Sequence, residues 1–367
     1  MTGKKKLTLK WLAALGLPAA LIGLFYLLRG RKPLMAAWVE GVIAPAEQFL
    51  GRLWAVFPFS AAELLTALAL VSGAVWLVRA AVLLAKKREG TAFLRRLLAL
   101  GAACLWAWAG MCWMWNVCYY APDFTERSGL SAQPHTTQEL LAVTVWFAQN
   151  AARLSSQAAR DAEGRFAEPQ EDYFRRGGQV YENLSREFPC LDIPATRAKP
   201  LFFSRLQSIL GFTGVYFPFT GEANVNVDAP ASLHPATIAH EMAHQRMVAS
   251  ELEASFVGIA AAVTSGDPVF QYSGFLMGLI DLSNALYSVS PDTWRQVVQL
   301  CFTPELSADW NENYEYWKAL ESPVDRAAEH TYDSFLKGNG QSLGIASYGA
   351  CVDLLITYFL PQAVPAA

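Results

Sequence analysis

Two histidines with a glutamate between them are the residues of this 367-residue chain best suited to chemistry: His240, Glu241 and His244. Residues four apart lie on one face of a helix, so both imidazoles can hold one metal ion. Glu241 projects about 100° round the helix from His240, which places its carboxylate beside the ion rather than on it. There it can take a proton from a water molecule that zinc has acidified, as this motif does in metalloproteases. We therefore predict one Zn²⁺ per chain, with Glu241 as general base.

The alternative is a helix that carries these residues on a solvated face, without a metal. Three features favour the metal. Pro235 suits the start of the helix, because it lacks an N–H that would be unpaired there. A strand-like segment precedes the helix, and acidic residues follow it directly.

A catalytic zinc needs a third protein ligand, for which Glu251 and Glu253 are the candidates. Ser250 and Glu253 fit a capping box at the start of a helix over residues 251–264, which leaves Glu251 for the metal. Glu253 stays the alternative ligand. Ser255 shares a helix face with Glu251 and is placed to support the ligand through a hydrogen bond. His234 is a weaker candidate, because its position before Pro235 is typical of a helix entry.

Two short strands, over residues 213–219 and 222–228, are expected before the motif helix. The second strand alternates, with Ala223, Val225 and Val227 on one face and polar residues on the other. Hydrophobic spacing predicts helices over residues 139–162, 171–188, 201–210, 235–248, 251–264, 270–289, 293–300, 324–336 and 345–360. Because the last contains Asp353 and is too short to span a membrane, we expect it to be buried. Residues 122–367 are thus predicted to form one globular domain.

The first third of the chain, residues 1–121, reads as a membrane domain. Its three apolar runs, over residues 11–28, 61–85 and 97–120, can each cross a hydrocarbon core that needs roughly 20 residues. Between the first two runs, residues 35–56 have the composition of an amphipathic helix at the interface. Basic residues cluster before the first run and between the second and third, which predicts a cytoplasmic N-terminus and an extracytoplasmic second domain. They are Lys4, Lys5, Lys6, Lys10, Lys86, Lys87, Arg88, Arg95 and Arg96.

Composition excludes some functions. The net charge of −3, without a basic stripe away from the apolar runs, gives no reason to expect a nucleic-acid partner. Three of the six cysteines lie in the third apolar run and the other three are widely spaced, so neither a disulfide framework nor a cysteine metal site is expected.

The motif followed by a glutamate on the next helix resembles the gluzincin group of metallopeptidases. Nearly the whole chain is also similar to the bacterial membrane proteins grouped as domain of unknown function 3810. The matching stretches are Phe-Pro-Phe-Ser-Ala-Ala-Glu at 57–63, Trp-Asn-Val-Cys-Tyr-Tyr at 115–120, Gly-Glu-Ala-Asn-Val-Asn at 221–226, Ala-His-Glu-Met-Ala-His-Gln-Arg at 239–246, Glu-Leu-Glu-Ala at 251–254, Tyr-Ser-Gly at 272–274 and Ser-Tyr-Gly at 347–349.

The resemblance implies a mainly helical protein of the bacterial cell membrane, in which a three-helix transmembrane region precedes an α+β zincin-like (gluzincin) domain. Gluzincins place an edge strand beside the metal, where substrate pairs as a further strand. Residues 222–228 are the candidate, with Asn224 and Asn226 binding substrate; an ordinary hairpin strand is the alternative. Tyr348 is the expected oxyanion donor, with Tyr272 and His330 as further candidates. Where gluzincins commonly carry Glu-x-x-x-Asp, this chain ends the matching stretch in Ser255.

The predicted function is that of a membrane-anchored zinc metalloendopeptidase, whose partners are the lipid bilayer and a protein or peptide substrate. The alternative is a non-catalytic zinc-binding membrane scaffold or partner-binding protein, although such a protein has no need of Glu241. We do not expect a protease that cuts within the bilayer, because the motif helix also carries Gln245 and Arg246 and follows a polar strand.

Overall fold

The computed structural model describes residues 10–85, 90–343 and 351–364, and most of them are helical. Contacts within the chain divide it into two units. The first comprises Met1–Pro45 and Ala61–Ala121, and the second comprises Ala46–Ser60 and Pro122–Ala367. Each unit is described by itself below.

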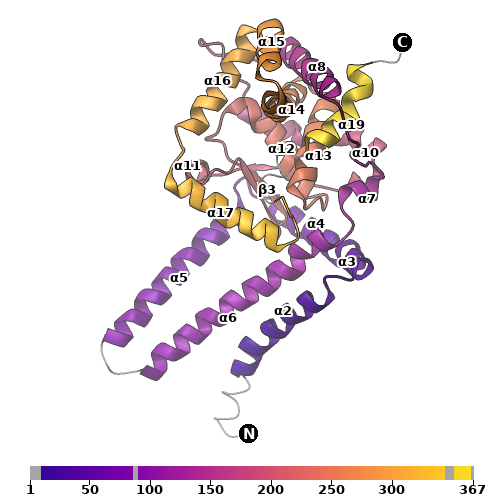
Figure 1. The fold of residues 1–367 in the computed structure, drawn as a ribbon. Coiled ribbons are helices and arrows are strands. Elements are labelled where there is room, and N and C mark those ends of the chain that lie inside the picture. Colours follow the sequence, from indigo (N-terminus) through magenta and orange to yellow (C-terminus); the bar gives the residue numbers. More distant parts are fainter. Residues whose placement is uncertain (1–9, 86–89, 344–350, 365–367) are drawn as a thin grey trace. The chain divides into compact units, whose positions relative to one another are not determined.

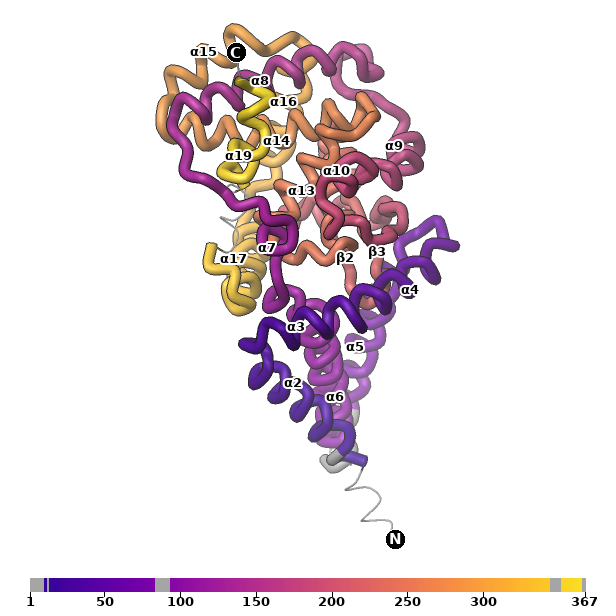
Figure 2. The backbone as a smooth tube through the Cα atoms, turned by 90° about the vertical axis from the view of Figure 1, so that its right-hand side faces the viewer, coloured from indigo at the N-terminus to yellow at the C-terminus, as the bar shows by residue number. Residues whose placement is uncertain are grey.

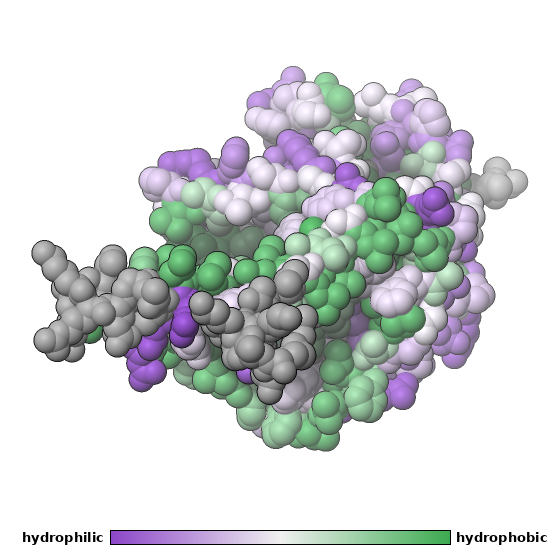
Figure 3. Space-filling view, turned by 90° about the horizontal axis from the view of Figure 1, so that it is seen from below, coloured by the Kyte–Doolittle hydropathy of each residue, from purple (hydrophilic) through white to green (hydrophobic). Residues whose placement is uncertain are grey.

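Among the described residues, all the regular elements of the first unit are helices (Figure 1). Stretches long and apolar enough to cross a membrane are Ala61–Val82 and Phe93–Met114, and few of their residues are buried. They lie in α5 (Ala61–Ala85) and α6 (Gly90–Met114), so the third apolar run forms a helix that starts earlier and ends sooner than predicted. A shorter apolar stretch, Ala13–Leu28, covers most of η1 (Leu12–Gly16) and all of α2 (Leu17–Leu28). Figure 3 shows hydrophobic side chains over broad areas of the face it presents.

The remaining elements of the first unit are short. They are α3 (Lys32–Trp38), η2 (Val39–Ile43) and the 3-10 turn η3 (Asn116–Tyr120) that follows α6. Aromatic side chains join them to the apolar helices: the Trp113 ring lies edge-on to Phe25 and to Trp38, at centroid distances of 5.8 and 5.4 Å.

The second unit contains a three-stranded sheet: β1 (Lys199–Pro200), β2 (Gly214–Phe217) and β3 (Glu222–Val225). The strand order is β1-β3-β2, with β1 parallel and β2 antiparallel to β3. The two predicted strands are therefore confirmed, but the prediction that the second lies at an edge is wrong. Strand β3 is central and buried along its whole length, polar residues included, because both of its sides are paired.

The predicted helix over residues 251–264 coincides with α13 (Glu251–Thr264). The one over residues 171–188 is broken into α9 (Gln170–Arg176), η4 (Gly177–Gln179) and α10 (Glu182–Glu187). Helix α16 (Pro304–Lys318) was not predicted. The other elements of the second unit are α7 (Phe124–Ser128), α8 (Thr137–Ser155), η5 (Pro189–Leu191), α11 (Ser204–Ile209), η6 (Ala231–Leu233), α12 (His234–His244), α14 (Pro268–Val289), α15 (Pro291–Cys301), α17 (Pro323–Gly338) and α19 (Val352–Ala363).

The core of the second unit forms where α14 packs on α8 and α13, with α12 against α13 on the side of the sheet (Figures 1 and 2). Phe147 on α8 contacts Phe275 on α14 and Phe359 on α19, at ring-centroid distances of 5.2 and 5.1 Å. Helix α19 is thus a buried helix, as predicted; residues 345–350, at the start of the predicted range, lie outside the described residues.

Residues 46–60, which the sequence placed in the membrane region, belong to the second unit. Most of α4 (Ala44–Trp54) lies in this segment. The buried Lys199 ammonium on β1 donates to the backbone oxygens of Trp54 and Phe59, at 2.7 and 3.1 Å. The Tyr216 hydroxyl on β2 donates to the buried carboxylate of Glu47. The segment is therefore bonded to two of the three strands.

Candidate metal centre

Helix α12 holds the two imidazoles of the motif. It begins at His234 with Pro235 in its first turn, and its four-residue spacing puts His240 and His244 on one face, with ring centroids 5.1 Å apart. Both side chains are buried. Helix α13 crosses closely behind them at Gly258, where a Cβ would come within 2.7 Å of the His240 Cα. A glycine is required at this crossing because a larger residue would push the two helices apart.

Glu251, the first residue of α13, completes the cluster. The chain reverses between α12 and α13 through Met247, whose φ of 60° is in the left-handed region. This reversal brings Oε2 of Glu251 to 3.2 Å from Nε2 of His240 and 3.7 Å from Nε2 of His244. The three ligand atoms lie within 4.8 Å of one another, and all three residues are buried.

The donor set fits a zinc ion. Two imidazole nitrogens and one carboxylate oxygen are ligands that zinc takes in catalytic sites with an open position. Oε2 of Glu251 is buried, and the partners given for it are the two imidazole nitrogens themselves, so the three ligand atoms face one another. The other nitrogen of each ring, Nδ1, also has a hydrogen-bond partner. Nδ1 of His244 lies 2.7 Å from the Val248 carbonyl oxygen, and Nδ1 of His240 lies 3.5 Å from Oγ of Ser255. These contacts leave each Nε2 facing the cluster.

Charges in the cluster compensate one another when no metal is bound. Burial disfavours the imidazolium of His244, but the Glu251 carboxylate outweighs it and raises the pKa of His244 to about 9. Burial also opposes the charge of Glu251, yet the two histidines hold its pKa well below the usual range. A divalent cation would take over this compensation, because it binds the neutral imidazoles and the carboxylate together.

Glu241 is held apart from the three ligands. Its side chain is buried, and burial raises its pKa to about 8. Strand β2 passes over it: a Cβ at Gly214 would lie 2.4 Å from Oε1 of Glu241. Oε2 has no hydrogen-bond partner among the described residues. The structure therefore places a buried carboxylate beside the ligand cluster, and its second oxygen is unpaired among the described residues.

Glu253, the alternative ligand, is used elsewhere. Its two carboxylate oxygens accept hydrogen bonds from the backbone N–H groups of Phe124 and Thr125, both at 2.9 Å, at the first turn of α7. The predicted capping box is wrong, because Ser250 makes no side-chain hydrogen bond at the start of α13. Glu253 instead satisfies unpaired donors at the start of another helix.

The predicted substrate-binding asparagines are both buried in the sheet. Nδ2 of Asn224 donates to the Val215 and Glu222 carbonyl oxygens, and Nδ2 of Asn226 donates to Ser208 and to the Phe212 carbonyl oxygen. These side chains hold β2, β3 and α11 together. The prediction that this segment forms an edge strand is wrong, because β3 is the central strand. Substrate binding by Asn224 and Asn226 stays a prediction.

The other donors considered from the sequence lie away from the cluster or outside the described residues. Tyr348 falls in the undescribed residues. The Tyr272 hydroxyl donates to the buried Asp309 carboxylate, which also pairs with Arg160 at 2.6 Å. His330 is exposed on α17. His234 is bonded through its ring nitrogens to Tyr173 at 2.9 Å and to the Ala229 carbonyl oxygen at 2.8 Å.

Three residues of the site were not found from the sequence. The Tyr332 hydroxyl on α17 donates to Oε1 of Glu251, the oxygen that faces away from the imidazoles. Gly214 lies over Glu241, and Tyr216 lies on the same strand with its ring 6.2 Å from that of His244. These contacts join residues about 25 to 80 positions apart, and no local pattern marks them.

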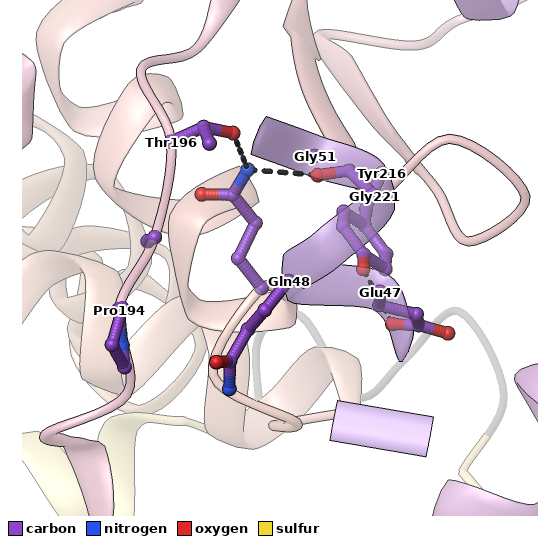
Figure 4. Close-up of a pocket in the computed structure, with 9 residues that line it drawn as sticks. Glu47, Gln48, Gly51, Pro194, Thr196, Tyr216 and Gly221 are labelled. Carbon is purple, nitrogen blue, oxygen red and sulfur yellow. Dashed lines mark hydrogen bonds between the residues drawn. The ribbon is translucent and has the colours of Figure 1, made fainter. Parts of the chain in front are cut away.

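The residue after the motif fixes the end of α12. Nε2 of Gln245 donates to Oγ1 of Thr196 at 3.1 Å and to the Gly221 carbonyl oxygen at 3.0 Å (Figure 4). Gln245, Thr196 and Gly221 line a pocket, and Glu47 and Gly51 of α4 line it too. A Cβ at Gly221 would lie 2.2 Å from the Glu47 carbonyl oxygen, so α4 approaches the turn before β3 as closely as backbone allows. The segment 46–60 therefore packs against residues that support the end of the motif helix.

These features define a mainly helical protein with a buried His-His-Glu cluster of metal-ligand type. The chain belongs to the family described as protein of unknown function DUF3810, whose family model matches residues 38–356. The match covers both ligand helices and both candidate spans. No curated protein and no solved structure matches the chain.

Proposed function

We propose that this protein is a membrane-anchored zinc metallopeptidase. The observation that carries the proposal is the convergence of His240, His244 and Glu251 in a buried cluster, with Glu241 next to it and outside the ligand set. The three clustered residues would hold the ion. When bound, zinc would act as a Lewis acid toward the substrate carbonyl and lower the pKa of a water molecule.

Glu241 supplies the proton transfers. Its Oε2 accepts a proton from the attacking water, and the same carboxyl then gives a proton to the departing amine. Without metal, burial raises the pKa of Glu241 to about 8, so the carboxyl is mostly protonated near neutral pH. A bound cation would lower this pKa and favour the carboxylate that the base role needs. A scaffold protein would gain nothing from the Glu241 carboxylate, because burying a carboxylate oxygen without a partner destabilises the fold.

The substrate would bind along β2 rather than β3. In the described structure β2 pairs with β3 on one side only, and Val215 on it is exposed. An extended peptide can pair with such an edge through backbone groups. Gly214 then lies beside both the peptide and Glu241, which aligns the scissile bond with the general base.

The membrane anchor extends the proposal beyond the two apolar helices. We place three spans, in α2 with η1, in α5 and in α6, with a cytoplasmic N-terminus in a bacterial cell membrane. The basic residues before the first span and between α5 and α6 support this orientation. The second unit, with the ligand cluster, is then extracytoplasmic.

Zinc content and hydrolysis together test the proposal. The full chain is purified in detergent as wild type, His240→Ala and Glu241→Gln, and metal is measured before a peptide library is supplied. We expect one zinc per chain in wild type and in Glu241→Gln, none in His240→Ala, and hydrolysis by wild type alone. Zinc in wild type without a hydrolytic difference from Glu241→Gln would favour the scaffold alternative, since Ser255 stands where gluzincins carry a carboxylate. Absence of zinc from metal-replete wild type would overturn both.

A further inference from the structure

Two segments of the second unit that are far apart in the sequence expose large apolar side chains, which we call together the apolar surface. One consists of α4 and the residues after it, and the other follows β1. The surface comprises Leu53, Val56, Phe57, Phe59, Phe202 and Phe203, whose exposed fractions range from 41% for Phe57 to 85% for Phe202. A soluble surface does not ordinarily expose so many large apolar side chains in neighbouring segments.

The two segments are held together by a buried cation. Nζ of Lys199 pairs with the Glu222 carboxylate and donates to the backbone oxygens of Trp54 and Phe59. Phe202 follows three residues after Lys199, and its ring lies edge-on to Phe203 at a centroid distance of 5.1 Å. Phe57 contacts Phe59 at 5.4 Å. Lys199 thus bonds the segment that carries Phe57 and Phe59 to the sheet whose first strand precedes Phe202 and Phe203.

Chain continuity indicates what covers this surface. Phe59 lies two residues and Phe57 four residues before Ala61, the first residue of the apolar stretch in α5. At about 3.5 Å per residue, Phe57 is within about 14 Å of the start of that stretch. A bilayer has an interfacial layer of about 5–8 Å beyond each side of its hydrocarbon core, and aromatic side chains are enriched there. The residues between the two units must therefore pass through or beside this layer if α5 spans a membrane.

We propose that this apolar surface binds the lipid bilayer, with Phe202 and Phe203 inserted into its interfacial layer. Residues 201–206 would then be a second membrane contact of this chain, some 140 residues after the segment that leads into α5. The contact does not depend on zinc or on catalysis. It would keep the ligand cluster at a fixed depth above the lipid, because Lys199 and Glu222 belong to the same sheet as β2.

A pair of nitroxide labels tests this contact. The full chain with Cys104→Ser, which removes the exposed cysteine, serves as parent. Phe202→Cys and Leu300→Cys are each labelled in lipid nanodiscs, and collisions with oxygen and with a water-soluble nickel chelate are measured. Leu300 is the matched control, because its exposed fraction is 84% and it lies on α15 of the same unit. Signal from the unsubstituted parent is subtracted.

We expect the oxygen-to-nickel accessibility ratio to be several-fold higher at position 202 than at position 300. Equal ratios would overturn the proposal, since both side chains would then be in water. Spin–spin broadening at position 202 with low access to both reagents would also overturn it, because a second copy would cover the surface. If Phe202→Cys does not fold, Leu206→Cys, at 55% exposure on α11, provides the same comparison.

Discussion

At the scale of single residues, the site depends on the residues that contact the side chains of Glu241 and Glu251. Glu241 is pressed between α12 and the backbone of β2, whereas Glu251 is held from α17 by the Tyr332 hydroxyl. Neither contact involves a neighbour in sequence. The proposed metal ligand Glu251 and the proposed general base Glu241 can therefore be perturbed separately, and the proposed function gives two predictions.

Gly214→Ala should impair catalysis without loss of metal. The new Cβ would come within 2.4 Å of Oε1 of Glu241 and push the carboxylate away from the attacking water. A displacement of this size can cost about 10²-fold in turnover. Hydrolysis and zinc content are measured on the same preparations. Gly266→Ala is the control, because nothing lies within 4 Å of its Cβ; an equal loss in both variants would contradict the prediction.

Tyr332→Phe should weaken zinc binding. The substitution removes the hydrogen bond that orients Glu251, and such supporting contacts typically account for about 10–100-fold in metal affinity. Affinity is measured by competition with a chelator. Tyr316→Phe removes a hydroxyl bonded to the Asp228 carboxylate elsewhere in the unit, so its affinity should stay at the wild-type value. A loss of affinity in Tyr316→Phe alone would refute this assignment.

At the scale of elements, two contacts fix α12 and α13. At the start of α12, His234 is buried between Tyr173 and the Ala229 carbonyl oxygen. At the start of α13, Glu253 binds the first turn of α7, and Arg127 of α7 reaches back to the Met247 carbonyl oxygen at 3.3 Å. The corner that carries Glu251 is thus clamped by a short helix more than 120 residues earlier in the chain.

Glu253→Gln should destabilise the protein while retaining zinc. A glutamine oxygen can accept from α7, but its amide nitrogen would face a backbone N–H, and a buried donor left without an acceptor costs about 1–3 kcal/mol. Glu251→Gln should show the opposite pattern, with zinc lost. Urea unfolding and metal content of both variants are compared. Loss of zinc from Glu253→Gln with unchanged stability would make Glu253 the ligand.

The metal-free protein should become less stable in mild acid, because His234 takes up a proton more readily in the unfolded chain than in the folded one. Burial lowers the pKa of His234 to about 4, below the value of 6.5 for an accessible imidazole, so the unfolded chain binds the proton more readily. The stabilising contribution is complete above pH 6.5 and is lost as the pH falls toward 4. At about 1.4 kcal/mol per pKa unit, the loss reaches about 3 kcal/mol.

His234→Gln is the comparison, since glutamine keeps a donor and an acceptor and does not titrate. The difference in unfolding free energy between the two proteins is measured from pH 7 to 4 in the presence of a chelator. We expect the difference in unfolding free energy to change between pH 7 and 4, because only the wild type carries His234. The contributions of carboxylates common to both proteins cancel in this difference. Parallel curves would show that His234 does not titrate with unfolding.

At the scale of the whole molecule, the second unit is discontinuous in sequence. It takes residues 46–60 from between two helices of the first unit, and this segment binds Lys199, Tyr216 and the turn at Gly221. A division of the chain at residue 121 therefore cuts through one folded unit. The support of the motif helix by Gln245 lies directly beside this segment.

A fragment with only Pro122–Ala367 should be unstable. The Lys199 ammonium would lose two backbone acceptors, and each bond to a charged group contributes about 1.5–3 kcal/mol. A synthetic peptide of Ala46–Ser60 added to the fragment should raise its thermal midpoint, because a ligand of the folded state stabilises it by mass action. A scrambled peptide is the control. A fragment as stable as the full chain, and indifferent to the peptide, would contradict this prediction.

The sequence by itself determined the features that rest on local periodicity and spacing. Apolar runs marked α5 and α6, helical spacing marked α12 and α13, and the four-residue interval put His240 and His244 on one face, because neighbours along a helix are fixed by its pitch. The alternating residues of β3 were found as a strand but were wrongly placed at the edge of the sheet. Alternation does not reveal that a polar side chain will be bonded inside a sheet.

Only the tertiary structure decided which distant residues meet. Glu251 rather than Glu253 faces the imidazoles, because the turn at Met247 sets the direction of α13 and the N-terminus of α7 takes up Glu253. The same holds for Gly214 over Glu241, for the central place of β3 and for the transfer of residues 46–60 to the second unit. Each results from packing and hydrogen bonding between segments whose order in the chain sets no distance between them.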